Sequence, residues 1–279
     1  MAILNISRTS YYCPRTVKAE SDAIAITQLQ AVHLEHPFYG VYRLSLHLGW
    51  SQNKTGRIRN QAGIKIMVAS KKQRCKRGRP EISALPNALH SYAVFKNKTR
   101  PQDGVDYSNM VNAEAWVQDF THLWFERSFC YLAVVMDLKT RQTVGWRLGT
   151  NHSSELTYWA LLDALSKHSP PAILHSDQGS EYLSYKHQII CQKLEVTLSC
   201  SSKSSPWQNG FMERWFSTFK TELGSLARFN DLAEVHEAIA LQIHYYNTKR
   251  IHTALKTTPE DYANKLLLAR DKVFAEIRG

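Results

Sequence analysis

The stretch AWVQDFTHLWF (residues 115–125) is followed by SFCYLAVVMDL (128–138) and TVGWRLG (143–149). All three runs are rich in β-branched and aromatic residues, and only short polar breaks separate them. Runs of this composition and length favour β-strands, and breaks this short favour antiparallel neighbours. The sequence therefore predicts three consecutive strands in an antiparallel meander.

Downstream of the meander, helical and strand patterns alternate. SSELTYWALLDALSKH (153–168) has helical periodicity and stops before two prolines, and it carries on one side Leu156, Trp159, Leu162 and Leu165. The further expected elements are a strand AILHSD (172–177), a helix around 181–194, a strand VTLSC (196–200), and amphipathic helices near 209–224 and 231–247. This order predicts a mixed α/β domain over residues 112–279.

Residues 1–70 have a helical pattern. VYRLSLHL (41–48) predicts a short helix that ends at Gly49, and Ser51 is a suitable N-cap for a further helix. Short helices joined by tight turns, the last one basic, are typical of a helix-turn-helix unit, so Arg57 and Arg59 are candidate DNA contacts. An ordinary helical hairpin with solvated arginines is the alternative.

Positive charge is concentrated in the N-terminal part of the chain. Residues 1–104 hold 17 Lys/Arg and 5 Asp/Glu, net +12, whereas residues 105–279 hold 18 and 19, net −1. Because KKQRCKRGRP (71–80) contains glycine and proline, we expect an extended basic linker over residues 71–111. Such a linker can follow a phosphate backbone, although a solvated charge run without a partner is the alternative. Its candidate DNA contacts are Lys71, Lys72, Arg74, Lys76, Arg77 and Arg79.

Composition excludes several classes of protein. A hydrophobic content of 43% with 21% charged residues is typical of a globular chain. No apolar run approaches the roughly 18–20 residues of a membrane span, and the N-terminus has no secretory pattern. The five cysteines are scattered without a CxxC spacing, which argues against a disulfide framework and a cysteine-rich zinc site. We therefore expect a cytoplasmic protein with no membrane partner.

Three acidic residues occupy positions that suit a shared site. Asp119 lies within the first expected strand, Asp177 ends the fourth, and Glu213 lies in a helix. In that helix Glu213 falls on a polar face, opposite an apolar face of Met212, Trp215, Phe216, Phe219 and Leu223. Each acid alone is more typical of a structural or solvated group, but 35 residues separate the second acid from the third.

Several motifs, in order, resemble the insertion-sequence transposases of the OrfB type, within the DDE transposase and retroviral integrase superfamily. The last two acids of that superfamily share this separation. The resembling segments are ISRTSYY (6–12), HPFYGVYRL (36–44), WVQDFTHL (116–123), HSDQGSEY (175–182), SPWQNGFMERWFSTFKTEL (205–223) and YYNTKRIHTALKTTPEDY (245–262). The sequence departs mildly from the family pattern at Gln118 and Trp207, neither of which is one of the three acids.

The resemblance implies a ribonuclease-H-like mixed five-stranded sheet with helices, preceded by a helix-turn-helix-like region. It also implies that Asp119, Asp177 and Glu213 are the catalytic residues and the ligands of two Mg²⁺ or Mn²⁺ ions. Carboxylates are natural ligands of such hard ions, and a metal pair can promote in-line phosphodiester displacement. Asn209 and Lys220, in the third-acid motif, are expected to contact DNA.

For function, the resemblance implies strand cleavage at insertion-sequence ends followed by strand transfer. The expected partners are double-stranded DNA at element ends and targets, further copies of this chain, and an upstream OrfA-type product or fusion. The expected location is the bacterial cytoplasm, with the nucleoid. A related nuclease without strand transfer and a non-catalytic DNA-binding regulator are the alternatives.

Overall fold

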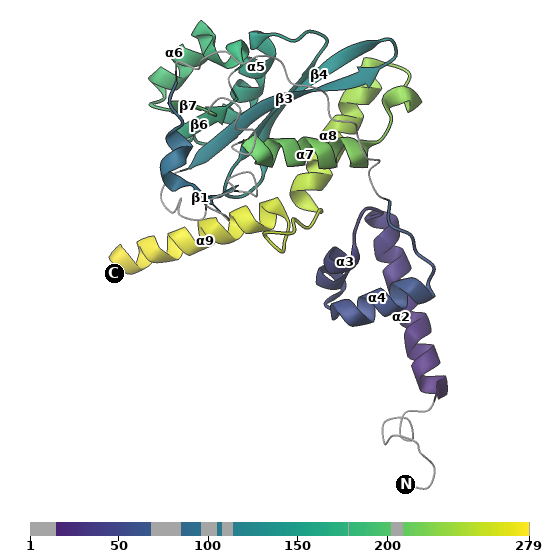
Figure 1. Ribbon diagram of the computed structural model, residues 1–279. Coiled ribbons are helices and arrows are strands. Elements are labelled where there is room, and N and C mark those ends of the chain that lie inside the picture. The colour runs from purple at the N-terminus through teal and green to yellow at the C-terminus, as the bar shows by residue number, and fades with distance from the viewer. Residues whose placement is uncertain are drawn as a thin grey trace. The chain divides into compact units, whose positions relative to one another are not determined.

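A computed structural model describes residues 15–67, 85–95, 105–107, 114–177, 179–201 and 209–278 (Figure 1). The chain forms two compact units. The first comprises residues 1–71 and 251–256, and the second comprises residues 72–250 and 257–279. In the part of the chain that the structure describes, no helix has both the length and the apolar character that a membrane crossing requires.

The second unit is built on a mixed five-stranded sheet. Its strands are β3 (Ala115–Phe125), β4 (Ser128–Asp137), β5 (Thr143–Gly149), β6 (Ile173–Ser176) and β7 (Thr197–Cys200). They are arranged in the order β5-β4-β3-β6-β7. The first three strands pair antiparallel, whereas β6 is parallel to both β3 and β7. The predicted meander and the mixed five-stranded sheet are confirmed.

The hairpin of β3 and β4 extends beyond the rest of the sheet on one side. Its register is continuous from Trp116↔Asp137 to Phe125↔Ser128. In contrast, β6 pairs with β3 only over residues 115–117. Because β3 has no sheet partner on its β6 side after Val117 among the described residues, the two parallel strands part there.

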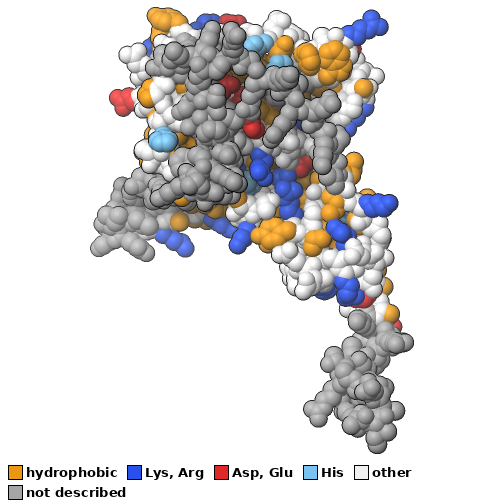
Figure 2. Space-filling model, viewed as in Figure 1, with side chains coloured by type: hydrophobic (Ala, Val, Ile, Leu, Met, Phe, Trp, Pro, Cys, Tyr) orange, Lys and Arg blue, Asp and Glu red, His pale blue; other side chains and the backbone are white. Residues whose placement is uncertain are grey.

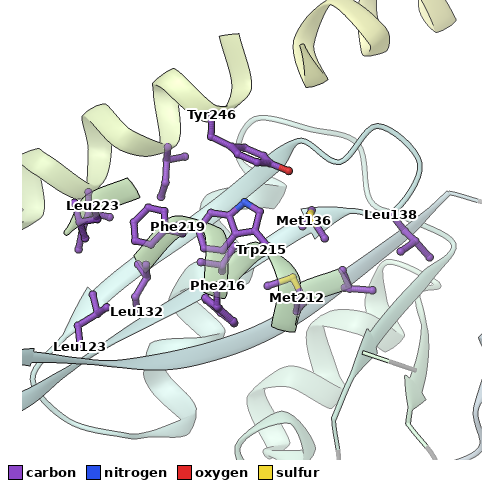
Figure 3. Close-up of a cluster of buried hydrophobic side chains, with 14 of the residues drawn as sticks. Leu123, Leu132, Met136, Leu138, Met212, Trp215, Phe216, Phe219, Leu223 and Tyr246 are labelled. Carbon is purple, nitrogen blue, oxygen red and sulfur yellow. The ribbon is translucent and has the colours of Figure 1, made fainter. Parts of the chain in front are cut away.

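Helices α7 (Gly210–Leu223) and α8 (Leu232–Thr248) cover one face of the sheet (Figure 1). Trp215 and Phe219 of α7 stack with ring centroids 4.7 Å apart, in a cluster that also contains Leu132 and Met136 of β4 (Figure 3). The buried side chains of α7 are Met212, Trp215, Phe216, Phe219 and Leu223. These are the residues that the helical spacing predicted for the apolar face.

Helix α5 (Ser154–Leu165) packs on the opposite face, through different residues than we expected. Its buried side chains are Leu156, Thr157, Ala160, Leu161 and Ala164. Trp159, which helical spacing places on the same side as Leu156, is 51% exposed. The small residues decide the packing, since a Cβ atom at Gly145 of β5 would lie 2.5 Å from the carbonyl oxygen of Ala160.

The helix expected around residues 181–194 is two separate elements. A 3₁₀ turn, η4 (Ser180–Leu183), precedes helix α6 (Tyr185–Lys193). Ser184 between them is extended, with ψ of 149°, and its hydroxyl contacts Nδ1 of His187 at 3.2 Å. A serine in this conformation starts a new helix rather than continuing one.

Part of the expected linker belongs to the folded unit. Residues 88–92 form a 3₁₀ turn, η2 (Ala88–Tyr92), and β1 (Val94–Phe95) pairs with β2 (Val105–Asp106). Leu89 and Tyr107 are buried in the same cluster as α7. The expectation of an extended linker over residues 71–111 is therefore wrong for these segments, because the buried side chains of Leu89 and Tyr107 attach them to the core.

A long C-terminal helix, α9 (Pro259–Arg278), was not expected. Its start has clear signals: the Thr258 hydroxyl accepts a hydrogen bond from the backbone of Asp261 at 3.1 Å, and Pro259 is the first helical residue. Its contacts include α8.

A buried ion pair links α7 to the segment that follows α8. Arg250, just after α8, donates from Nε to both carboxylate oxygens of Glu222 in α7, at 2.8 and 3.0 Å. The two side chains are only 4% and 6% exposed. Gln242 also donates to Glu222, at 3.2 Å, so the carboxylate has two hydrogen-bonding partners.

The first unit contains α2 (Arg15–Glu35), α3 (Val41–Leu48) and α4 (Gln52–Gln61). As the sequence predicts, α3 ends at Gly49 in the left-handed conformation, and the Ser51 side chain caps α4 by accepting from Lys54 N. Ala25, Leu29 and Ile58 form a small buried cluster. The N-terminal helical region is thus present.

Residues 251–256 complete this first unit, although they are distant in sequence. The backbone N–H of Ile251 donates to the buried Tyr39 hydroxyl at 2.6 Å, and Arg43 donates to the Thr253 hydroxyl at 3.2 Å. Two of the motifs that carried the resemblance, at residues 36–44 and 245–262, therefore meet here.

Candidate active site

Asp119 and Asp177 lie where β3 and β6 part. The last parallel pair is Val117↔His175, and each aspartate follows its partner residue by two positions. The two carboxylates therefore emerge at the same point of the sheet, as acids at strand ends do in other α/β sites. The register of the parallel strands, which the sequence alone does not specify, brings them together.

Asp119 is held by two hydrogen bonds. Its Oδ1 accepts from the backbone N–H of Phe120 at 2.8 Å, and its Oδ2 accepts from the Asn209 side-chain amide at 3.0 Å. Burial raises the pKa of Asp119 well above its usual value, and the charges of Asp177, Glu213 and Glu181 raise it further. These four carboxylates are thus close enough to interact electrostatically.

Asp177 shares this environment. Its Oδ1 accepts from the backbone N–H of Gly179 at 3.0 Å. Burial raises the pKa of Asp177, and the nearby charge of Glu181 adds to the effect. The preceding His175 is fully buried and contacts the hydroxyls of Ser199 and Ser201, at 2.8 and 3.0 Å. Burial lowers the pKa of His175 to about 4, so it is a neutral hydrogen-bonding group at neutral pH.

Glu213 lies in the first turn of α7, and its side chain is exposed. Its packed neighbours Met212 and Trp215 fix α7 against the sheet. Lys220, two turns further along α7, lowers the pKa of His122 in β3 by its charge, after the larger effect of burial. Lys220 therefore acts on the same strand that carries Asp119.

Asn209 occupies the N-cap position of α7 but makes no capping hydrogen bond. Its side chain points to Asp119 instead and is only 6% exposed. Its Oδ1 is buried and has no hydrogen-bond partner among the described residues. A direct contact to an acid was not part of the sequence expectation for Asn209.

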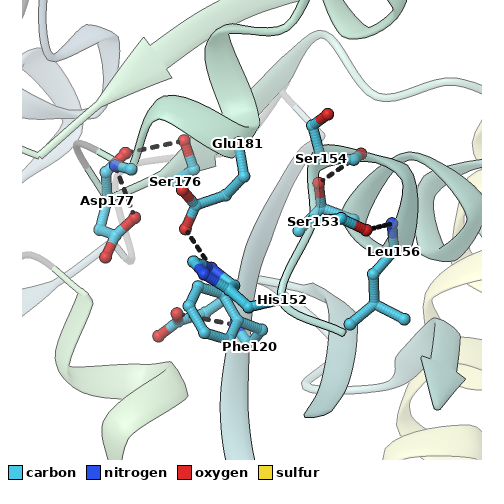
Figure 4. A network of polar contacts seen from close by, with 11 residues as sticks. Phe120, His152, Ser153, Ser154, Leu156, Ser176, Asp177 and Glu181 are labelled. Carbon is cyan, nitrogen blue, oxygen red and sulfur yellow. Dashed lines mark hydrogen bonds and ion pairs between the residues drawn. The ribbon is translucent and has the colours of Figure 1, made fainter. Parts of the chain in front are cut away.

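Three further residues of the site were missed by sequence reasoning. Glu181 contacts Nε2 of His152 at 3.3 Å, and the His152 ring lies 4.2 Å from that of Phe120 (Figure 4). Tyr182 is buried, and burial together with the charges of Asp119, Asp177 and Glu181 raises its pKa, so the phenol keeps its proton. Glu181 and Tyr182 belong to the HSDQGSEY motif, which is the signal that could have identified them.

The donor set fits a hard divalent cation, because it consists of carboxylate oxygens and the side-chain oxygen of Asn209. Within the described residues, no group of three or more His, Cys, Asp or Glu side chains stands in an arrangement that could hold a metal ion. Burial raises the pKa of both Asp119 and Asp177, and nearby carboxylates add to each effect, so a bound cation would favour their ionised forms.

The two arginines predicted to contact DNA in the first unit form hydrogen bonds within the protein. Arg57 donates to both carboxylate oxygens of Asp22, at 2.5 and 2.9 Å, and Arg59 donates to the Asn60 side chain. The basic residues predicted between 71 and 79 lie outside the described residues. They are Lys71, Lys72, Arg74, Lys76, Arg77 and Arg79.

Comparisons with known proteins agree with the motifs. Two family models, each described as "Integrase core domain", match residues 112–206 and 194–259. The transposase for insertion sequence element IS904 of Lactococcus lactis is 32% identical over 180 residues, which cover 60% of this chain and 71% of that protein. The 31 kDa protein of insertion element IS600 of Shigella sonnei is 30% identical, over 91% of this chain and 93% of that protein.

Among solved structures, the catalytic core domain of the HTLV-2 integrase in complex with magnesium is similar to this chain with a TM-score of 0.45. It is 20% identical and covers 54% of this chain and 95% of that one.

Proposed function

This chain belongs to the insertion-sequence transposases with an integrase core domain, and we propose that it cuts and joins DNA strands at Asp119, Asp177 and Glu213. Family membership assigns the chain to DNA transposition. The metal-dependent chemistry, the DDE roles of the three acids and the order of the steps are our proposal.

The observation that carries the proposal is the convergence of two aspartates where β3 and β6 part. The charge of Glu213 acts on the first of them. When bound, two Mg²⁺ or Mn²⁺ ions would neutralise charge on the phosphate and lower the pKa of a water. Asp119, Asp177 and Glu213 are the ligands we propose. Asn209 keeps Asp119 oriented, and its Oδ1, which has no hydrogen-bond partner among the described residues, is a further oxygen donor next to this contact.

The reaction proceeds in two displacements at phosphorus. A water oxygen attacks the phosphodiester at an element end, and the 3′ oxygen leaves as a hydroxyl. This 3′ hydroxyl then attacks a phosphodiester of the target, whose own 3′ oxygen leaves in turn. The number of phosphodiester bonds is conserved in the second step, so no ATP is needed.

The partner is double-stranded DNA, both at element ends and at target sites. We propose that several copies of the chain assemble on it in the bacterial cytoplasm, with the nucleoid. An upstream OrfA-type product or fusion remains a prediction. To contact DNA, Arg57 would have to break its hydrogen bonds with Asp22 or use its remaining donors. The proposed DNA contacts are Asn209, Lys220, Arg57, Arg59, Lys71, Lys72, Arg74, Lys76, Arg77 and Arg79.

The wild-type protein is the first test. We expect full-length protein with Mg²⁺ or Mn²⁺ to nick duplexes that carry the inverted repeats of its element, and to join the new 3′ ends to a second duplex. Denaturing gels with end-labelled strands measure both products. Nicking without joined products would identify a nuclease, and binding without either product would identify a regulator.

Lys220→Ala tests how the DNA end is held. Lys220 lies two helical turns from Glu213, about 10 Å along the axis, and a cation has no lone pair for a metal. We expect Lys220→Ala to slow cleavage of specific ends far more than nicking of random duplexes, because positioning controls the rate of such reactions strongly. Lys220→Arg should restore part of the rate.

The matched control is Lys265→Ala on the exposed side of α9, which should cut both substrates like wild type. Rates on the two substrates are compared at fixed Mg²⁺ and salt. Equal losses on both would indicate a general electrostatic role for Lys220, and no loss would exclude it from the DNA contact.

A further inference from the structure

Six aromatic and imidazole rings form a continuous strip, five of them on the β3–β4 hairpin and the sixth just after β5. Neighbouring centroids are 4.2 to 5.7 Å apart. The members from β3 are alternate residues, and they face partners in β4 through the pairs His122↔Tyr131 and Trp124↔Phe129. They therefore share one face of the sheet. This aromatic strip consists of Phe120, His122, Trp124, Phe129, Tyr131 and His152.

The aromatic strip is open to solvent at its far end. The cluster under α5 on this sheet face contains Ala133 and Val135 of β4, so the helix covers the inner part of the hairpin. Beyond it, Trp124 is 58% exposed and Phe129 is 48% exposed. Figure 2 shows histidine and hydrophobic side chains together on the upper part of the viewed face, with acidic side chains close by.

The inner end of the strip touches the proposed active site. Phe120 donates its backbone N–H to Asp119, and its ring lies 4.2 Å from that of His152, which contacts Glu181 (Figure 4). If the end of a DNA strand is held at the acidic residues, a row of flat rings thus leads away from that end.

Positive charge accompanies the strip. Lys220 is in α7 on the opposite face of the sheet, near enough for its charge to lower the pKa of His122 after the larger effect of burial. Arg147 of β5 is exposed and pairs with Ala133, which in turn pairs with Phe120, so its side chain is on the same sheet face. Flat rings beside cations are the combination that binds unpaired nucleotides, because every base has a face that stacks and a phosphate that attracts cations.

We propose that the aromatic strip stacks the bases of unpaired nucleotides next to the phosphodiester being cut. This proposal rests on the proposed function. A second copy of the chain is a poorer occupant, since the two most exposed rings offer roughly 200 Å² and a stable interface needs about 800 Å² per partner. The stacked bases hold the strand beside the acids after the duplex end opens.

Trp124→Leu tests the proposal, because it keeps an apolar side chain and removes the flat ring. Full-length protein is titrated, in EDTA, with fluorescent duplexes that end either blunt or in a four-nucleotide single-stranded overhang. We expect the variant to bind the overhang duplex about 5- to 150-fold more weakly, from about 1–3 kcal/mol per stacked base. Binding of the blunt duplex should not change.

Two comparisons isolate base stacking. The affinity of wild-type protein should fall by a similar factor when the overhang is abasic. Trp124→Phe should retain most of the affinity for the normal overhang. Trp159→Leu is the matched control, since Trp159 is 51% exposed on α5 and is not part of the strip.

Equal binding of the overhang by wild type and Trp124→Leu would overturn the proposal. A second result would also overturn it: light scattering shows a different mass for DNA-free Trp124→Leu than for DNA-free wild type, and wild type binds abasic and base-containing overhangs equally. The strip would then be an interface between copies of the chain. Neither result bears on whether the wild-type protein cuts and joins DNA, so the two proposals fail separately.

Discussion

Replacing Asp119 with Asn, Asp177 with Asn or Glu213 with Gln is expected to abolish strand cleavage while DNA binding persists. Each amide keeps the size of the side chain and removes one negative charge from the proposed cation site. Loss of one preorganised electrostatic contact typically costs about 10²–10³-fold in rate, and loss of a metal ligand should cost at least as much.

The same substitutions should not weaken the fold, and Asp119→Asn should strengthen it. The pKa of Asp119 is raised in the folded protein, so the folded state binds a proton more tightly than the unfolded chain does. The stability linked to this proton is present below the unfolded pKa and is lost as pH rises through the folded pKa. Above the folded pKa the ionised carboxylate is therefore a cost, which the amide removes.

Gel assays of cleavage are combined with melting temperatures measured at pH 7, with and without Mg²⁺ or Mn²⁺. Metal should raise the melting temperature of wild type more than that of the variants. Asp271→Asn and Glu237→Gln, at exposed positions of α9 and α8, are the controls and should behave like wild type. Near-wild-type nicking by any of the three variants would contradict the assignment.

Breaking the buried pair of Arg250 and Glu222 is expected to have the largest effect on stability. Arg250→Met leaves the Glu222 carboxylate buried without its cation, and Glu222→Gln leaves the guanidinium without its anion. Removing one partner of a buried pair typically costs about 3–5 kcal/mol in the free energy of unfolding.

Urea unfolding of the double variant distinguishes the pair from simple packing. Glu222→Gln with Arg250→Met should recover most of the loss, because neither charge then remains buried alone. Arg270→Met, at an exposed position of α9, is the control and should change the free energy of unfolding by less than about 0.5 kcal/mol. Single variants as stable as this control would show that the ion pair contributes little.

Local sequence patterns were sufficient for the strands of the meander and for the buried face of α7. The expected strand 115–125 coincides with β3, because its run of β-branched and aromatic residues has clear polar boundaries. Similarly, Trp215 and Phe219 are spaced for one side of a helix, and both are buried there. These features depend only on near neighbours in the chain.

Packing between elements could not be predicted in the same way. Trp159 matches the apolar period of α5, yet the side of the helix that approaches Gly145 closely carries the small residues Ala160 and Ala164, and Trp159 stays exposed. Hydrophobicity alone does not distinguish a large residue that packs from one that a smaller neighbour displaces.

The contacts around the three acidic residues also could not be predicted from the sequence. Asn209 and Asp119 are 90 positions apart, and only the register of the fold shows that they are hydrogen-bonded. His152 lies in the connection between β5 and α5, whereas Glu181 lies in the 3₁₀ turn η4. The spacing of Asp177 and Glu213 indicated the acids themselves, but not the residues that orient them.

The discontinuity of the first unit determines when that unit can be completed during biosynthesis. Arg43 and its partner Thr253 are separated by 210 positions in the sequence. Tyr39 and its partner Ile251 are separated by 212. At about 5–20 residues per second, the ribosome needs roughly 10–40 s to cover this interval. The N-terminal helices therefore leave the exit tunnel long before their last contacts exist, and any nascent chain released before residue 251 lacks them.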